Sequence, residues 1–144
     1  MRQEYSREGF TPAALLIPVS VSPLEGGKDC PATALIDTGA DISVLPSKLR
    51  EELDLTLLGY TECSGAFDEE SKTVPTYYVR MSVADVWIGE VEVILTSSPY
   101  VLLGRDILNS LLLIADGPKS VFELTNANTM NSGATRPVSP TGSS

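Results

Sequence analysis

One aspartate stands at the point of the chain best suited to carboxylate chemistry. Asp37 follows the apolar run Ala34-Leu35-Ile36 and precedes Thr38 and Gly39. This order predicts a strand that carries Asp37 into a tight loop, where the Thr38 hydroxyl can bond to the backbone and Gly39 permits conformations that a β-carbon would forbid. The chain contains no histidine, the commonest general base in enzymes. Catalysis by this loop would therefore rely on carboxylates.

A second motif lies far downstream, where the apolar run Val101-Leu102-Leu103 leads into Gly104-Arg105-Asp106. With Asp37-Thr38-Gly39-Ala40, this segment resembles the active-site loop and the apolar-Gly-Arg-Asp/Asn segment of the retropepsin-like aspartic proteases, the single-lobe relatives of the pepsins. Each motif alone is a weak match, whereas the two in this order, separated by a strand-rich stretch, are much more specific. The resemblance implies an all-β fold, a closed antiparallel β-barrel-like lobe with one or two short helices, which assembles as a two-fold homodimer.

Asp37 needs a second carboxylate to hydrolyse an amide. One ionised group must take a proton from water, and one protonated group must polarise and then protonate the scissile bond; two carboxylates about 3 Å apart divide their ionisation in this way. The sequence holds no second Asp-Thr-Gly or Asp-Ser-Gly motif. The partner is most simply Asp37 of another copy, because a two-fold interface brings each residue to its own counterpart. We therefore expect a homodimeric aspartic endopeptidase that acts on protein or peptide substrates.

The resemblance also implies roles for residues around Asp37. Thr38 would hydrogen-bond across the dimer axis, and the Gly39 N–H would lie beside the Asp37 carboxylate. Ala40 and Asp41 would contact substrate, and Asp41 would form an ion pair with the arginine of the second motif. The segment Leu103-Gly104-Arg105-Asp106 would support the site. The structural alternatives are that Asp37 caps a loop, that Asp41 is an exposed turn residue and that Arg105 is a surface charge at a helix end.

Residues 60–74 have apolar arms around a small and acidic turn, which predicts a hairpin. In the resembled family the hairpin at this place is the flap that covers the substrate, and Ser64-Gly65-Ala66 would be its tip. The segment has one glycine where retroviral flaps carry several. A solvated surface hairpin is an equally good interpretation of the local sequence.

Composition limits the partners of the protein. With 10 Lys and Arg against 19 Asp and Glu, the 144-residue chain has a net charge of −9, which opposes binding to nucleic acid or to anionic membranes. The two cysteines, Cys30 and Cys63, have no metal-ligand spacing, so we expect neither a metal site nor a cofactor, and favour free thiols over a disulfide. No secretory signal or membrane span is evident, and a cytoplasmic location is expected.

Periodicity predicts the elements that position the site. Strands are expected over 10–22, with prolines that suggest an edge position or bulges, and over 32–36 and 42–45. Pro46 is expected in the first turn of a short helix, in which Leu49 and Leu53 face the core. Alternating strands follow over 77–95, and one or two helical turns over 105–109 place Ile107 and Leu108 inward. A hairpin is expected from Leu111 to Leu124.

The domain organisation follows from these elements. Residues 1–9 are predicted to be a flexible lead-in, 10–124 the protease domain and 125–144 a disordered tail. The hairpin at 111–124 exceeds what one small core needs, and we predict that it contributes strands to the dimer interface. One alternative keeps the fold without turnover, as a non-catalytic dimeric peptide-binding or scaffolding module. Another is a structural monomer.

Overall fold

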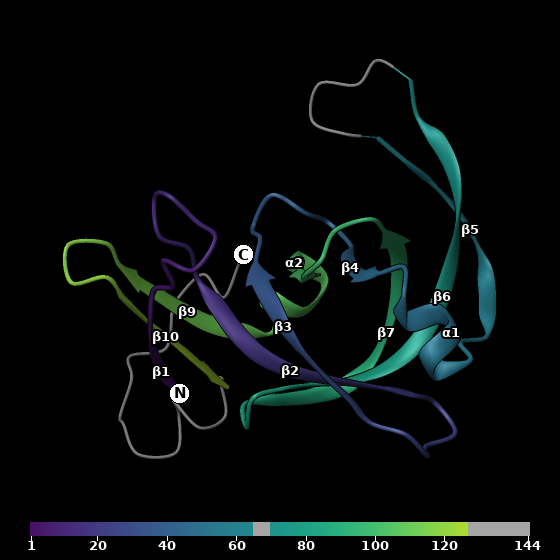
Figure 1. Cartoon of the computed structure of the whole chain (residues 1–144), viewed down its shortest axis with the longest axis horizontal. Helices are drawn as coiled ribbons and strands as arrows, with labels where there is room; N and C mark the ends of the chain where they lie inside the picture. Colours follow the sequence, from purple (N-terminus) through teal and green to yellow (C-terminus); the bar gives the residue numbers. More distant parts are fainter. Residues whose placement is uncertain (65–69, 127–144) are drawn as a thin grey trace, which may run out of the picture.

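The part of the chain that the structure describes, residues 1–64 and 70–126, folds into ten strands and two short helices in the computed structural model (Figure 1). This confirms the expected all-β class with one or two short helices. The strands are β1 (Arg2–Glu4), β2 (Leu16–Pro23), β3 (Cys30–Ile36), β4 (Ser43–Pro46), β5 (Leu57–Cys63), β6 (Lys72–Val83), β7 (Trp87–Thr96), β8 (Val101–Leu103), β9 (Leu111–Asp116) and β10 (Val121–Asn126). The helices are α1 (Leu49–Leu53) and α2 (Arg105–Leu108).

Six strands close into a barrel in the order β2-β3-β8-β4-β7-β6, and β2 pairs with β6 to complete it. Strand β5 lies outside this ring, attached to β6 alone. The predicted closed barrel is confirmed. It is not purely antiparallel, because β3 pairs with β8 and β4 pairs with β7 in parallel. These parallel pairs join segments far apart in the sequence, so periodicity could not reveal them.

Strand β2 differs from the expected strand over 10–22. It begins at Leu16 and lies between β3 and β6 rather than at an edge. The barrel tolerates Pro18 because pairing with β6 begins only at the next residue, Val19. The Pro18 carbonyl accepts a hydrogen bond from the Ala84 N–H at 3.0 Å, where the chain turns between β6 and β7.

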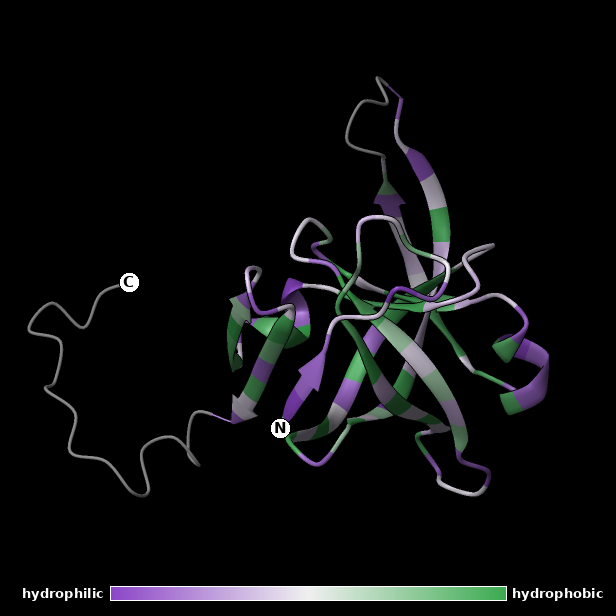
Figure 2. Ribbon diagram, turned by 60° about the vertical axis from the view of Figure 1, so that its left-hand side comes forward, coloured by the Kyte–Doolittle hydropathy of each residue, from purple (hydrophilic) through white to green (hydrophobic). Residues whose placement is uncertain are grey.

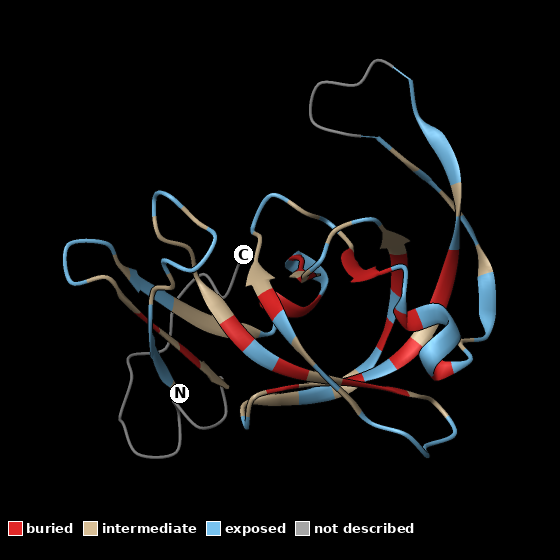
Figure 3. Cartoon of the chain, in the orientation of Figure 1, coloured by how far each residue is buried: buried red, intermediate tan, exposed pale blue. Residues whose placement is uncertain are grey.

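The core lies inside the barrel and is formed by mostly aliphatic residues at alternate positions of the strands, together with Leu49 and Leu53 of α1. Hydrophobic and buried segments are coloured along the barrel strands in Figures 2 and 3. Leu49 and Leu53 are buried as predicted, at 2% and 3% exposed. The expectation that Pro46 opens this helix is wrong. Pro46 ends β4, and the ladder with β7 continues to Ser47, whose N–H donates to the Thr96 carbonyl at 2.8 Å; the helix begins only at Leu49.

A separate three-stranded sheet, β1-β10-β9, packs its inner face on the barrel core through Phe122 and Leu124. The hairpin predicted from Leu111 to Leu124 is confirmed as β9 and β10. A flexible lead-in over 1–9 is wrong for Arg2–Glu4, which form β1 along β10. The Leu124 N–H donates to the Met1 carbonyl at 2.9 Å, so this first strand is fixed by backbone pairing. The tail predicted over 125–144 is wrong for Thr125 and Asn126, which belong to β10, and from 127 onward it lies outside the described residues.

Neither helix within residues 1–64 and 70–126 has the length and apolar character needed to cross a membrane.

Candidate active site

Parallel pairing of β3 with β8 brings the two sequence motifs together. Ala34 pairs with Val101 and Ile36 with Leu103, so the strands end side by side. The Asp37 N–H extends this ladder by donating to the Leu103 carbonyl at 3.0 Å. Asp37 therefore leaves the barrel next to the start of α2.

The loop after β3 holds the Asp37 carboxylate through its own backbone. The Gly39 N–H donates to Asp37 Oδ1 at 3.0 Å, as the resemblance implied, and the Ala40 N–H donates to the Asp37 carbonyl at 3.2 Å. A β-carbon on Gly39 would lie 3.2 Å from the same Oδ1, tighter than most contacts of this kind. Asp37 is half-buried, while Thr38 and Gly39 are exposed. The backbone of its own loop thus orients the carboxylate, and the residues that follow it, Thr38 and Gly39, face solvent.

Arg105 supports the loop in a different way from the one expected. Its guanidinium Nη1 donates to the Thr38 carbonyl at 2.7 Å, and its backbone N–H donates to the Ala40 carbonyl at 2.8 Å. The expected ion pair with Asp41 is wrong, because the ion pairs within the described residues do not include either side chain. Within the described residues the guanidinium donates to the Thr38 carbonyl instead.

Asp106 anchors the second motif to β4. Its Oδ2 accepts the Ser43 N–H at 2.9 Å, and its Oδ1 accepts the Ser43 hydroxyl at 2.7 Å and the Ile107 N–H at 3.0 Å. Ser43 Oγ in turn accepts the buried Gly104 N–H at 3.0 Å. One serine therefore ties β4, Gly104 and α2 together.

Ser43 is the supporting residue that sequence reasoning missed. Its signal in the sequence was a serine within the otherwise apolar run 42–45, and the structure buries this serine fully. Gly104 was expected, and its role is steric: a β-carbon there would lie 2.9 Å from the Ala40 carbonyl oxygen and 3.0 Å from the Ile42 carbonyl. The two motifs can pack this closely only through glycine.

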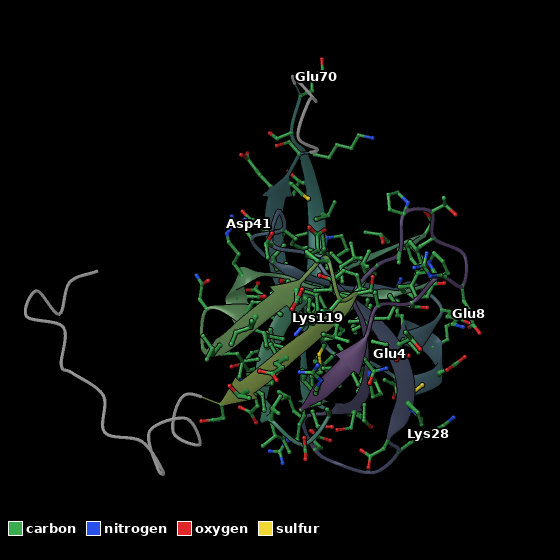
Figure 4. All side chains as sticks on the ribbon, turned by 90° about the vertical axis from the view of Figure 1, so that its left-hand side faces the viewer. Glu4, Glu8, Lys28, Asp41, Glu70 and Lys119 are labelled. Carbon is green, nitrogen blue, oxygen red and sulfur yellow. The ribbon has the colours of Figure 1, made fainter. Side chains whose placement is uncertain are left out.

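A cavity of about 200 Å³ lies between the loop and the β5–β6 hairpin. Its lining comes from both, namely Asp41, Ile42, Thr61, Glu62, Cys63 and Ser64. In Figure 4 Asp41 lies at the foot of this hairpin, and Glu70 marks its far end. The predicted hairpin is confirmed as β5 and β6. Of the predicted tip, Ser64 is exposed beside the cavity, while Gly65 and Ala66 lie outside the described residues.

A larger hollow of about 480 Å³ lies elsewhere, around the turn between β6 and β7 and Trp87. No residue of the Asp37 loop lines it, so the position of the carboxylate, rather than the size of the hollow, locates the candidate site. Cys30 and Cys63 are both free thiols. Within residues 1–64 and 70–126, no group of three or more His, Cys, Asp or Glu side chains could hold a metal ion.

Comparison with known proteins supports the assignment of the fold. The chain resembles a retropepsin-like aspartic protease from Rickettsia conorii, with a TM-score of 0.61 and 17% identity over 86% of this chain and 88% of that chain. It also resembles the protease of simian foamy virus (mac), with a TM-score of 0.50 and 20% identity over 66% of this chain and 92% of that one. These identities show similarity of fold.

The foamy viral protease-reverse transcriptase in complex with an RNA/DNA hybrid has a TM-score of 0.52 and 23% identity over 67% of this chain. This chain covers 12% of that longer one. No curated protein matches the sequence. A family model described as aspartyl protease matches residues 17–107, which include both motifs and the hairpin. The chain therefore belongs to the aspartyl protease family and has the fold of a retropepsin-like aspartic protease.

Proposed function

We propose that the protein is a homodimeric aspartic endopeptidase in which the Asp37 carboxylates of two identical chains share one active site. The observation that carries this proposal is the single Asp37 loop, fixed by Gly39 and by Arg105 and open to solvent. One carboxylate cannot serve as base and acid at the same step, and the sequence has no second motif of this kind. The site is completed by another copy of the loop, across a two-fold axis.

The paired carboxylates act by dividing one proton. Because two negative charges about 3 Å apart repel each other, one Asp37 is ionised and the other protonated. The ionised carboxylate takes a proton from water, whose oxygen attacks the peptide carbonyl, while the protonated carboxyl hydrogen-bonds to the carbonyl oxygen. The tetrahedral intermediate collapses as a proton passes to the leaving nitrogen. The apparent pKa values belong to the pair and not to either chain.

The substrate is an extended peptide held between the loop and the hairpin. The cavity beside Asp41 and Ile42 receives part of it, and Thr61 and Cys63 form the opposite wall. The hairpin acts as the flap, with Ser64, Gly65 and Ala66 in its tip, and Ala40 contacts the peptide backbone. Closure of this flap separates the reacting groups, together with the attacking water molecule, from bulk solvent.

The dimer is joined in part by the three-stranded sheet. Strand β9 has no partner on its outer edge among the described residues, and Ile114 is 48% exposed on the face away from the core. Deletion of 111–124 would remove Phe122 and Leu124 from the core, so a point change is the cleaner test. We expect Ile114→Lys to weaken the dimer about tenfold or more in sedimentation, whereas Ile88→Lys, at a more exposed isoleucine on β7, leaves it unchanged. Equal dimerisation of both variants contradicts this interface.

The decisive experiment replaces Asp37 with asparagine. The substrate is an unfolded protein, and mass spectrometry detects the peptides released from it. We expect Asp37→Asn to abolish this cleavage, because an amide cannot take a proton from water. The dimer should remain, since the Gly39 N–H can still donate to the side-chain oxygen. Asp85→Asn, an exposed aspartate between β6 and β7, is the control. Cleavage by purified Asp37→Asn protein refutes the assignment, and wild-type protein that binds peptides from about pH 3 to about pH 7 without cleaving them is instead a scaffolding module.

A further inference from the structure

The outer side of the hairpin carries apolar surface that neither the barrel nor the cavity uses. Five large apolar side chains are exposed in the described chain, and three of them lie within four residues of β5: Leu57 at 46%, Leu58 at 53% and Tyr60 at 67%. Pro75, directly opposite Tyr60 on β6, is exposed as well. Leu58 and Tyr60 are two residues apart on β5, and Pro75 is the cross-strand partner of Tyr60, so these three share one face of the hairpin; we call them the outer hairpin patch. Single exposed apolar residues are ordinary, whereas a contiguous group marks an interaction surface.

Strand β5 also offers a free backbone edge. It pairs with β6 alone, and no strand of the described residues covers its other side (Figures 1 and 3). The cavity is lined by Thr61 and the residues that follow it, and alternation along the strand directs the side chain of Tyr60 to the side opposite that of Thr61. Long apolar edge strands are usually shortened, charged or covered, because their unpaired N–H and C=O groups accept a further strand. An edge left open beside apolar side chains is suited to pairing with an extended chain.

Charges around the patch select the chemistry of that chain. Asp54 and Glu62 are exposed before and after the patch along the sequence, and Glu51 is exposed on α1. Two nearby basic residues do not offset these negative charges at the patch. The Arg50 guanidinium lies over the Tyr77 ring, 5.8 Å from its centre. Lys72 is the cross-strand partner of Cys63, on the side of the hairpin away from Tyr60. With a net charge of −9 for the chain, the local field attracts basic side chains and repels acidic ones.

We infer that the free edge of β5 and the outer hairpin patch bind an extended apolar segment with basic side chains, which belongs to the protein substrate outside the stretch that is cleaved. The identity of this occupant rests on the proposed function. The same strand lines the cavity with Thr61 and Cys63 and carries the patch with Leu58 and Tyr60, so a substrate chain that leaves the cavity meets the edge of β5. Contacts of this kind would make a protein substrate bind more tightly than a short peptide, while the peptide bond that is cleaved stays the same.

The test measures binding at the edge with the cleft blocked. The Asp37→Asn protein, saturated with a peptide mimic that carries a central hydroxyl, is titrated into a fluorescent peptide of about ten residues that alternates valine and lysine. We expect binding by anisotropy, and a loss of about tenfold or more in the Leu58→Ser, Tyr60→Ser double variant. The control is Ile88→Ser, which removes an equally exposed apolar side chain from β7 and should change affinity less than about twofold.

Two further peptides separate strand pairing from general adhesion. A valine–glutamate peptide should bind at least about tenfold more weakly because of charge, as should a valine–lysine peptide with alternate amides methylated, because it lacks the N–H groups that pair with an edge. No binding, equal binding by the double variant, or equal binding of the methylated peptide overturns the inference. Cleavage of short peptides by the wild-type protein is measured separately. If that cleavage is absent while edge binding persists, the protease assignment fails and the binding surface stands.

Discussion

Replacement of Ser43 by alanine tests whether the second motif supports the Asp37 loop through one hydroxyl. Ser43 Oγ donates to Asp106 at 2.7 Å and accepts the Gly104 N–H at 3.0 Å. In Ser43→Ala the buried Gly104 N–H loses its acceptor, which costs about 1–3 kcal/mol. Asp106 loses one of three donors, but it is exposed and water can replace that donor, so this part costs less than about 1 kcal/mol. The sum is a loss of about 1–4 kcal/mol in the free energy of unfolding.

Urea unfolding at a fixed chain concentration measures this loss. With a dependence on urea of about 2 kcal/mol per molar, the midpoint should fall by about 0.5–2 M, with an unchanged slope. The fixed concentration matters because dimerisation adds to apparent stability. The control is Ser47→Ala, an exposed serine past the end of the same strand whose side chain makes no hydrogen bond in the described structure; it should change stability by less than about 0.5 kcal/mol. If both variants unfold at the wild-type midpoint, the Ser43 hydroxyl does not anchor the motif.

Two further predictions concern close packing and thiol chemistry. Gly104→Ala should lower the free energy of unfolding by about 1–3 kcal/mol and reduce peptide cleavage, because its β-carbon would lie 2.9 Å from the Ala40 carbonyl oxygen. The control is Gly117→Ala, whose β-carbon would meet nothing within 4 Å. Equal unfolding midpoints for the two variants would contradict the packing argument. Burial, a hydrogen bond from its thiol to Glu52 and the Glu52 charge raise the pKa of Cys30. Glu52→Gln should therefore lower this pKa and speed alkylation of Cys30 near pH 8 in a Cys63→Ser background, and an unchanged rate would show that burial alone sets the pKa.

The sequence was most informative where the chemistry is local. The Asp37 carboxylate and the Gly39 N–H lie two residues apart, and one turn builds their hydrogen bond, so the contact that the resemblance implied is present here. The Arg105 partner was wrong because the resemblance supplied a residue pair without its geometry. Ser43 was missed because its partners, Gly104 and Asp106, reach it only after the barrel has brought β8 beside β4. Contacts between distant segments depend on strand order, which periodicity does not encode.

The contacts around Asp37 explain why half of a site can be stable by itself. Within the described residues, the carboxylate and its loop are oriented by the Leu103 carbonyl, the Gly39 N–H and the Arg105 guanidinium, which donates to the Thr38 carbonyl. These groups belong to the same chain as Asp37, so they can order the loop before a second copy binds. Preorganisation of this kind lowers the cost of assembly, because a second copy has only to bring its own loop to the axis without ordering the first. In the proposed enzyme, the fold of each chain therefore sets the geometry of its own Asp37 carboxylate, and dimerisation supplies the second carboxylate that catalysis needs.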